Sequence, residues 1–334
     1  MLLGNCCSLR FTWPVTNTNR RAWVVGILAA LGVGAITAVQ ALVNSELAVR
    51  VSDAMLAGAW SFISAAVIVT LVVLLRPASR RGLASVIGKM RLGEMSWWLF
   101  AGSMFGFGFI AIQSWTVSAI GVAVFSVAMV AGQNVGGLAI DRIGLSGSGV
   151  QALNTGRVVA AIVGIGAALV AAAPALGSAS ASIVMIVAVL FAGVFASTQV
   201  AVSGRIAIGA HDTWVGAFGA FLVGAFAFGV IEIVRIAMGS PGLDALFTVL
   251  ADSPLLGIGG ICGAVLMFLA SMSVIRVGVL IFGLAAVIGQ FVLAILFDVI
   301  NGKVGGYVYI VIALVLTAVS LFIAARFSRS NTEL

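Results

Sequence analysis

Long stretches without a charged residue dominate this sequence, and their lengths decide what it can fold into. The stretch from Glu94 to Asp141 would measure about 69 Å as a single helix, whereas the bilayer core is about 30 Å thick. It is therefore predicted to form two helices with a turn at Ser114–Gly121. The stretch Arg157–Arg205 is predicted to divide in the same way, at the Ala-, Gly- and Ser-rich segment Pro174–Ser182.

Ten membrane-spanning helices follow from the complete set of charge-free stretches. Hydrophobic residues make up 62% of the chain and charged residues 8%, compared with about 45–50% and about 25% in soluble domains. No soluble fold of this size can hide that much apolar surface, so the predicted fold class is an all-α integral membrane protein. The helices are expected near residues 22–44, 55–75, 96–114, 119–140, 157–173, 182–204, 213–235, 254–272, 277–298 and 305–325.

The basic residues predict the orientation of these helices. If the N-terminus is cytoplasmic, the outer segments contain only Arg50, Arg235 and Lys303 of the 17 Lys and Arg residues. This bias is the positive-inside pattern of membrane proteins, and it explains the net charge of +7 without a nucleic-acid partner. We therefore predict a multi-pass protein of the bacterial cytoplasmic (inner) membrane, with both termini in the cytoplasm.

Residues that recur at a constant spacing indicate an internal repeat. Six pairs share one offset, from the first (259 − 102 = 157) to the last (298 − 141 = 157). Because each copy then holds five helices, an odd number, the second copy is predicted to be inverted, as in many secondary transporters. The six pairs are Gly102/Gly259, Gly106/Gly263, Gly121/Gly278, Gly132/Gly289, Gln133/Gln290 and Asp141/Asp298, and upstream Gln40/Gln199 and Asn44/Ser203 match at an offset of 159 (199 − 40 = 159).

The repeat divides the chain into five segments. Residues 1–21 are predicted to be a cytosolic N-terminal tail, because Arg10, Arg20 and Arg21 occur there among polar residues. Residues 22–173 form the first five-helix repeat and residues 182–326 the second. Residues 174–181 are predicted to be an extracytoplasmic linker, and residues 327–334 a cytosolic C-terminal tail.

Two motifs of the first copy resemble those of a known family. Val39–Asn44 contains a Q-x-x-x-N pattern, and Ala131–Gln133 is followed by Asp141–Gly144 with the sequence Asp-Arg-Ile-Gly. Both resemble signatures of the YdcZ-like family of the drug/metabolite transporter (DMT) superfamily, whose usual member has one five-helix unit. The chain resembles a tandem fusion of two such EamA-like units, which implies an exporter of small molecules. In the second copy, Ser203 and Val299–Asn301 depart from the pattern.

Polar side chains within the spans are the candidates for a substrate site, because they are costly in lipid and usually face a cavity or a partner helix. Gln133 and Gln290 each lie eight residues before an Asp at a helix end (141 − 133 = 8), about 12 Å from it. The two ends are on opposite faces, so both glutamines are expected to approach one central cavity. The alternative is that these side chains only hold helices together. The candidate substrate-binding residues are Gln40, Asn44, Trp60, Gln133, Asn134, Gln199, Ser203 and Gln290.

Glycines at G-x-x-x-G spacing are predicted to let helices pack closely, with a hinge or gate as the alternative role. The six candidates occur in both copies of the repeat. The helix-packing candidates are Gly102, Gly106, Gly132, Gly136, Gly259 and Gly263.

Carboxylates bear on ion coupling, and few of them lie near the spans. If the protein is coupled to protons, Glu46 is the leading candidate. It reaches a cavity only if its helix ends or unwinds near Asn44. The alternative is a surface Glu46 paired with Arg50, four residues further along the helix.

Catalysis and metal binding find no support in the residue types. Cys6, Cys7 and Cys262 are too few and too scattered for a metal site, and His211 is the single histidine. We predict no enzymatic activity, no cofactor and no metal. The predicted function is a secondary transporter that exports a small metabolite or drug-like compound by alternating access. Its predicted partners are then a small-molecule substrate and the lipid bilayer. The protein itself is expected to be a monomer or a homodimer. A flippase for a lipid-linked molecule is the first alternative, and a membrane receptor or structural protein the second.

Overall fold

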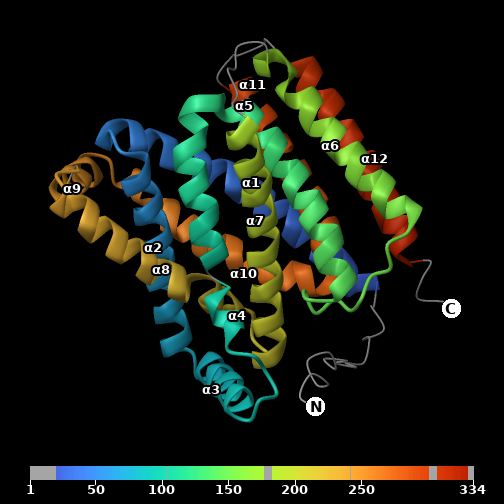
Figure 1. Cartoon of the computed structure of the whole chain (residues 1–334), viewed down its shortest axis with the longest axis horizontal. Helices are drawn as coiled ribbons and strands as arrows, with labels where there is room; N and C mark the ends of the chain where they lie inside the picture. Colours follow the sequence, from blue (N-terminus) through green and yellow to red (C-terminus); the bar gives the residue numbers. More distant parts are fainter. Residues whose placement is uncertain (1–19, 103, 177–182, 241, 301–306, 330–334) are drawn as a thin grey trace, which may run out of the picture.

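The computed structural model describes residues 20–102, 104–176, 183–240, 242–300 and 307–329. Most of the predicted tails and linker lie outside these residues. The described residues form a bundle of long helices (Figure 1). The elements are α1 (Arg20–Val51), α2 (Ala54–Leu75), α3 (Pro77–Arg91), α4 (Trp98–Ala101), α5 (Met104–Ile143), α6 (Thr155–Leu176), α7 (Ile183–Ala210), α8 (Thr213–Ala237), α9 (Leu243–Asp252), the 3-10 helix η1 (Pro254–Ile258), α10 (Gly259–Val277), α11 (Val279–Ile300) and α12 (Tyr307–Arg329).

The membrane spans agree with the sequence prediction. Among the described residues, nine helices are long and apolar enough to cross a membrane, and Trp98–Gln113 is a shorter apolar helical segment. Together they account for the ten predicted spans and confirm an all-α membrane protein. A helix is the expected form because lipid offers no hydrogen bonds to the backbone. The main differences from the prediction are at the C-termini of two helices, because α1 continues to Val51 and α7 continues to Ala210.

The predicted turn between Glu94 and Asp141 is a reversal within one helix. α5 is helical without interruption from Met104 to Ile143, yet the ring centroids of Phe109 and Phe125 are 6.5 Å apart. Sixteen residues of straight helix (125 − 109 = 16) would span about 24 Å. α5 therefore doubles back between these two rings, as Figure 1 shows, and supplies two spans.

Two short amphipathic helices lie outside the predicted spans. α3 begins with Pro77 in the first turn, a position that suits proline, and its Lys89 Nζ donates a hydrogen bond of 2.7 Å to the carbonyl of Gly209 at the end of α7. In α9, the buried Leu246 packs with Leu47 and Val51 of α1. Each amphipathic helix therefore belongs to one half of the chain and packs on the first helix of the other half.

The two halves meet through matching pairs of helices, α1 with α11 and α7 with α5. A Cβ atom added at Gly34 of α1 would clash with the carbonyl oxygen of Ala286, and one added at Gly193 of α7 would clash with that of Met129. The glycines differ by 159 positions (193 − 34 = 159) and the carbonyls by 157 (286 − 129 = 157). The same contact is thus built twice, with the halves exchanged.

A second set of contacts repeats this exchange from the other side of the interface. A Cβ atom at Gly132 of α5 would clash with the carbonyl oxygen of Leu190, and one at Gly289 of α11 with that of Leu31. Such an exchange requires a twofold relation between the halves. With five spans in each half, the axis lies in the membrane plane, so the repeats are inverted.

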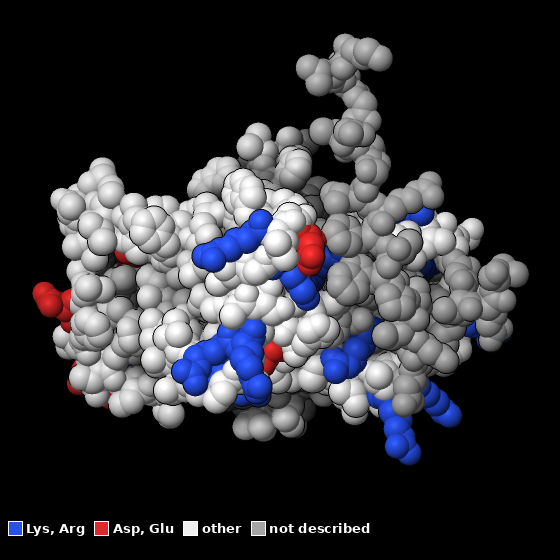
Figure 2. All heavy atoms as spheres, turned by 90° about the horizontal axis from the view of Figure 1, so that it is seen from below, with Lys and Arg blue, Asp and Glu red and all other residues white. Residues whose placement is uncertain are grey.

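The two ends of the bundle differ in charge. One end, here called the basic end, carries Arg76, Lys89, Arg91, Arg142 and Arg276, and Figure 2 shows Lys and Arg side chains gathered on this face. The opposite end, here called the acidic end, carries Glu46, Asp53, Glu232, Asp244 and Asp252. The positive-inside pattern predicts that the basic end is cytoplasmic.

Candidate functional site

The polar pair of α1 bonds to two neighbouring helices. Gln40 Nε2 donates to the carbonyl of Gly259 at 3.0 Å, which joins α1 to the other half of the chain. Asn44 Oδ1 accepts a hydrogen bond of 2.5 Å from Ser61 Oγ of α2. A Cβ atom at Gly259 would lie 2.5 Å from Asn44 Oδ1, so this glycine is needed for close approach.

The matching pair of α7 bonds within its own half. Gln199 Nε2 donates to the carbonyl of Ala220 at 3.0 Å, and Ser203 Oγ donates to that of Gly216 at 2.8 Å, both on α8. Ser203 Oγ also lies 2.5 Å from Ser271 Oγ of α10. Both side chains are buried. The α1 and α7 pairs therefore occupy matching places and have different partners.

Gln133 and Gln290 differ from these pairs because their side-chain amides have no hydrogen-bond partner among the described residues. Both are half-buried within spans. A Cβ atom at Gly193 would lie 2.7 Å from the backbone nitrogen of Gln133, and one at Gly34 would lie 2.8 Å from the backbone nitrogen of Gln290. The backbone of each glutamine thus lies at one of the exchanged helix contacts, and neither glutamine lines either of the two cavities described below.

Asn134, next to Gln133, is placed differently. It is buried, and its Nδ2 donates to the carbonyl of Ala161 on α6 at 3.3 Å. This bond holds two helices of the same half together. Trp60 packs edge to face against Phe247 of α9, with ring centroids 6.1 Å apart. Its indole Nε1 is buried and has no hydrogen-bond partner among the described residues.

Glu46 lies on the surface of the acidic end. It forms an ion pair of 2.7 Å with Arg50, and about half of each side chain is exposed. α1 remains helical to Val51, so the unwinding near Asn44 that would bring Glu46 to a cavity does not occur. The structure therefore favours the alternative of a surface ion pair for this carboxylate.

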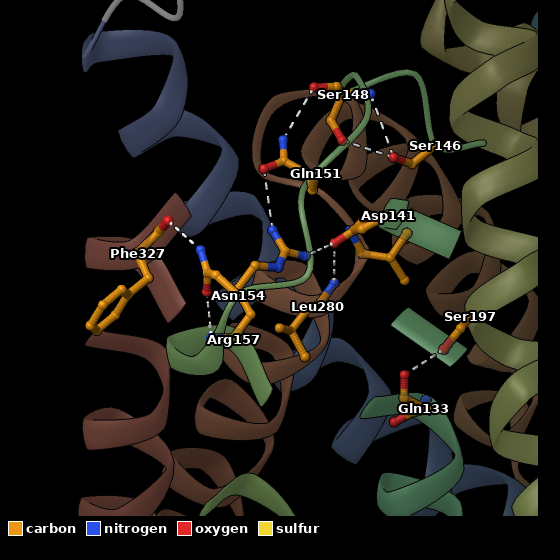
Figure 3. Close-up of polar contacts among 11 residues, drawn as sticks. Gln133, Asp141, Ser146, Ser148, Gln151, Asn154, Arg157, Ser197, Leu280 and Phe327 are labelled. Carbon is orange, nitrogen blue, oxygen red and sulfur yellow. Dashed lines mark hydrogen bonds and ion pairs between the residues drawn. The ribbon is translucent and has the colours of Figure 1, made fainter. Parts of the chain in front are cut away.

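A buried ion pair at the basic end was not predicted from the sequence (Figure 3). Asp141 at the end of α5 pairs with Arg157 of α6 at 2.5 Å, and both side chains are almost fully buried. Asp141 also accepts hydrogen bonds from the backbone amides of Val279 at 2.7 Å and Leu280 at 3.1 Å. Asp141 thereby caps the first turn of α11 and joins the two halves.

The loop between α5 and α6 completes this cluster. Gln151 Oε1 accepts a bond of 3.2 Å from Arg157, and Asn154 Oδ1 accepts one of 2.9 Å from the Arg157 amide. Asn154 Nδ2 donates to the carbonyl of Phe327 on α12 at 3.0 Å, as drawn in Figure 3. The Asp-Arg-Ile-Gly motif was the available signal for this cluster, because it places a carboxylate at a helix end inside an apolar chain.

A second ion-pair cluster joins the halves at the acidic end. Arg235 of α8 pairs with Asp53 at 2.6 Å and with Glu232 at 2.8 Å. Glu232 lies three residues before Arg235 on α8, the spacing of side chains on neighbouring turns of one helix face. The pairing with Asp53 was missed, since the two residues are 182 positions apart.

The basic end contains an open cavity of about 540 Å³ between α7, α8 and α10, with Arg76, the residue between α2 and α3, at its wall. Arg76, Asp212 and Arg276 contribute its charged groups, and Trp214 stacks on Phe268 in its wall with centroids 4.4 Å apart. Among the described residues, no group of three His, Cys, Asp or Glu side chains is placed to hold a metal ion. This cavity therefore offers charge and aromatic surface.

A family model described as "Putative inner membrane exporter, YdcZ" matches residues 25–170 and again residues 183–321. The chain belongs to this family. The two matches coincide with the two exchanged halves, so the chain is a tandem of two family units. The chain is also similar to a protein of known crystal structure, with 17% sequence identity and a TM-score of 0.62. The superposition covers 93% of this chain and 98% of the other chain. This similarity shows the fold alone. A search of curated proteins found no match.

Proposed function

We propose that the protein exports a small molecule across the inner membrane by alternating access between its two inverted halves. The observation that carries this proposal is the doubled glycine contact, in which Gly34 of α1 packs against α11 and Gly193 of α7 packs against α5. Two interfaces of the same construction can exchange conformations, and the exchange opens the site to one side of the membrane and then to the other. The family to which the chain belongs supports export as the direction.

The substrate is proposed to bind at Gln133 and Gln290. Their amides each offer two donors and one acceptor, and they lack hydrogen-bond partners among the described residues. A polar amide left unpaired within a span is costly unless water or a ligand satisfies it. Both glutamines lie beside the glycine contacts, so substrate bound to them would sense the conformation of the interface. Gln40, Asn44, Gln199 and Ser203, which already bond to protein groups, are proposed to hold the helices of this site.

A flippase for a lipid-linked molecule is the second candidate. An apolar groove of about 280 Å³ runs between α2 and α8, one helix from each half, with Thr70 as its polar residue. Val67 and Leu71 of its wall are each 52% exposed, within a span, so the groove is open toward lipid. An acyl or polyprenyl chain would fit such a surface.

Transport in proteoliposomes tests the proposal and separates the candidates. Vesicles with the purified protein would be screened against panels of small polar metabolites and fluorescent lipids, with and without a pH gradient. Proton coupling stays a prediction, and the gradient tests it directly. Flux of a water-soluble compound that Gln133→Ala abolishes would support the exporter. Lipid scrambling that is insensitive to Gln133→Ala, with no soluble flux, would contradict it.

A further inference from the structure

Asp53 and Asp212 hold equivalent places in the two halves. Each caps the first turn of a span: the Asp53 side chain accepts hydrogen bonds from the amides of Met55 and Leu56 in α2, and the Asp212 side chain accepts one from the amide of Trp214 in α8. Each follows a residue with a positive φ angle, which is Ser52 (57°) before Asp53 and His211 (53°) before Asp212. They differ by 159 positions (212 − 53 = 159), the offset that also relates Gln40 to Gln199.

An arginine follows each cap at the same distance. Arg76 lies 23 residues after Asp53 (76 − 53 = 23), and Arg235 lies 23 residues after Asp212 (235 − 212 = 23). The twofold relation exchanges the halves, so it maps the pair Arg235 with Asp53 onto the pair Arg76 with Asp212. The first pair would close the acidic end and the second the basic end.

Only the first of these two pairs is formed among the described residues. Arg235 Nη2 is 2.6 Å from Asp53 Oδ2, and the Asp53 side chain is 7% exposed. At the basic end, Arg76 is exposed and forms no ion pair with any part of the chain that the structure describes, and Asp212 Oδ2 accepts a bond of 2.9 Å from Ser79 Oγ instead. Arg76 and Asp212 line the same open cavity of about 540 Å³.

We propose that Arg76 and Asp212 form the gate of the basic end, and that their ion pair forms when the pair between Asp53 and Arg235 breaks. This gate rests on the proposed alternating access and gives it named residues. The structure is then the state with the basic end open and the acidic end closed. The surroundings of the two arginines also differ, because Glu232, which also binds Arg235, corresponds to Val73 in the first half (232 − 159 = 73). The extra carboxylate favours the state observed.

The gate is testable without a substrate, by the accessibility of the cavity at the basic end. Cys6, Cys7 and Cys262 would be replaced by serine and a single cysteine placed at Thr213, which lines the cavity. A membrane-impermeant maleimide added from the basic side measures how open the cavity is. We expect Asp53→Asn to lower the labelling rate about threefold or more, since it removes the pair that holds the acidic end closed.

A second substitution then isolates the gate itself. Asp212→Asn in the Asp53→Asn background is expected to restore the labelling rate, because the basic end can no longer close through Arg76. Asp244→Asn removes an exposed acid on α9 at the acidic end and is the matched control, with no change expected. Folding of each variant is checked by its elution from size exclusion.

The outcomes distinguish the gate from transport. An unchanged labelling rate in folded Asp53→Asn, or no recovery on adding Asp212→Asn, would overturn the gate whether or not a substrate is known. A shift in labelling with no transport of any tested compound would leave the gate standing and count against the exporter. Equal loss of labelling in Asp244→Asn would show a general charge effect and also overturn the gate.

Discussion

The first helices of the two halves, α1 and α7, show how one repeat is used in two ways. Gln40 of α1 bonds across the interface to the carbonyl of Gly259, whereas Gln199 of α7 bonds within its own half to that of Ala220. The acidic end is closed by an ion pair between the halves, and the equivalent residues of the basic end line a cavity. The two copies of the repeat therefore have different local conformations in one structure, which is what the proposed alternating access between the halves requires.

The largest expected effect concerns the buried pair of the basic end. Arg157→Met leaves the carboxylate of Asp141 buried without its partner, and loss of one partner of a buried pair costs about 3–5 kcal/mol. Arg235→Met at the acidic end should cost less, because the Arg235 side chain is 27% exposed. Thermal unfolding midpoints in detergent measure both. Arg142→Met, at an exposed neighbour, is the control, and equal midpoints for Arg157→Met and the control would refute this ranking.

The glycine contacts give the next largest effect and test the symmetry. Gly34→Ala and Gly193→Ala each place a methyl group against a backbone carbonyl, and such overpacking costs about 1–3 kcal/mol. We expect the two losses of stability to be similar. Gly166→Ala and Gly229→Ala have open space around the added carbon and should not destabilise. A large loss at only one of the two contacts would argue against equivalent interfaces.

A smaller, functional effect separates Gln133 from its neighbour. Gln133→Ala should reduce transport and leave the unfolding midpoint near that of the wild type, because this amide has no hydrogen-bond partner among the described residues. Asn134→Ala should destabilise by about 1 kcal/mol through loss of its bond to Ala161. Val135→Ala, at a side chain that is 57% exposed, is the control. Loss of folded protein in Gln133→Ala would favour a packing role instead.

The smallest effect is expected at Glu46. Its exposed ion pair with Arg50 contributes a few tenths of a kcal/mol at most, so Glu46→Gln should hardly change the unfolding midpoint. Flux measured with an imposed pH gradient is expected to respond as in the wild type. A lost response would restore Glu46 as the coupling residue.

The sequence predicted the membrane spans better than it predicted the short amphipathic helices between them and the ion pairs that join them. Charge-free stretches locate helices because burying a charge in lipid is costly, and this signal found all ten spans. The same reasoning overlooked α3 and α9, since an amphipathic helix carries its charges on one face. It also overlooked the pairs of Asp53 with Arg235 and of Asp141 with Arg157, which depend on how distant helices meet. The repeat offset relates Arg76 to Arg235 and Asp212 to Asp53. The sequence does not indicate that Arg76 and Asp212 could pair, and that inference depends on the ion pair that the structure shows between Arg235 and Asp53.

The central claim is that the two ends open alternately, and equivalent pairs of spin labels test it most directly. Labels at Leu75 and His211 report the basic end, and labels at Ser52 and Val234 report the acidic end at matching positions (211 − 52 = 159; 234 − 75 = 159). All four side chains are exposed. Distance distributions by double electron–electron resonance in nanodiscs should show two populations at each end. Asp53→Asn should shorten the distance at the basic end and lengthen it at the acidic end together. A single distance at each end, unchanged by Asp53→Asn, would contradict the account.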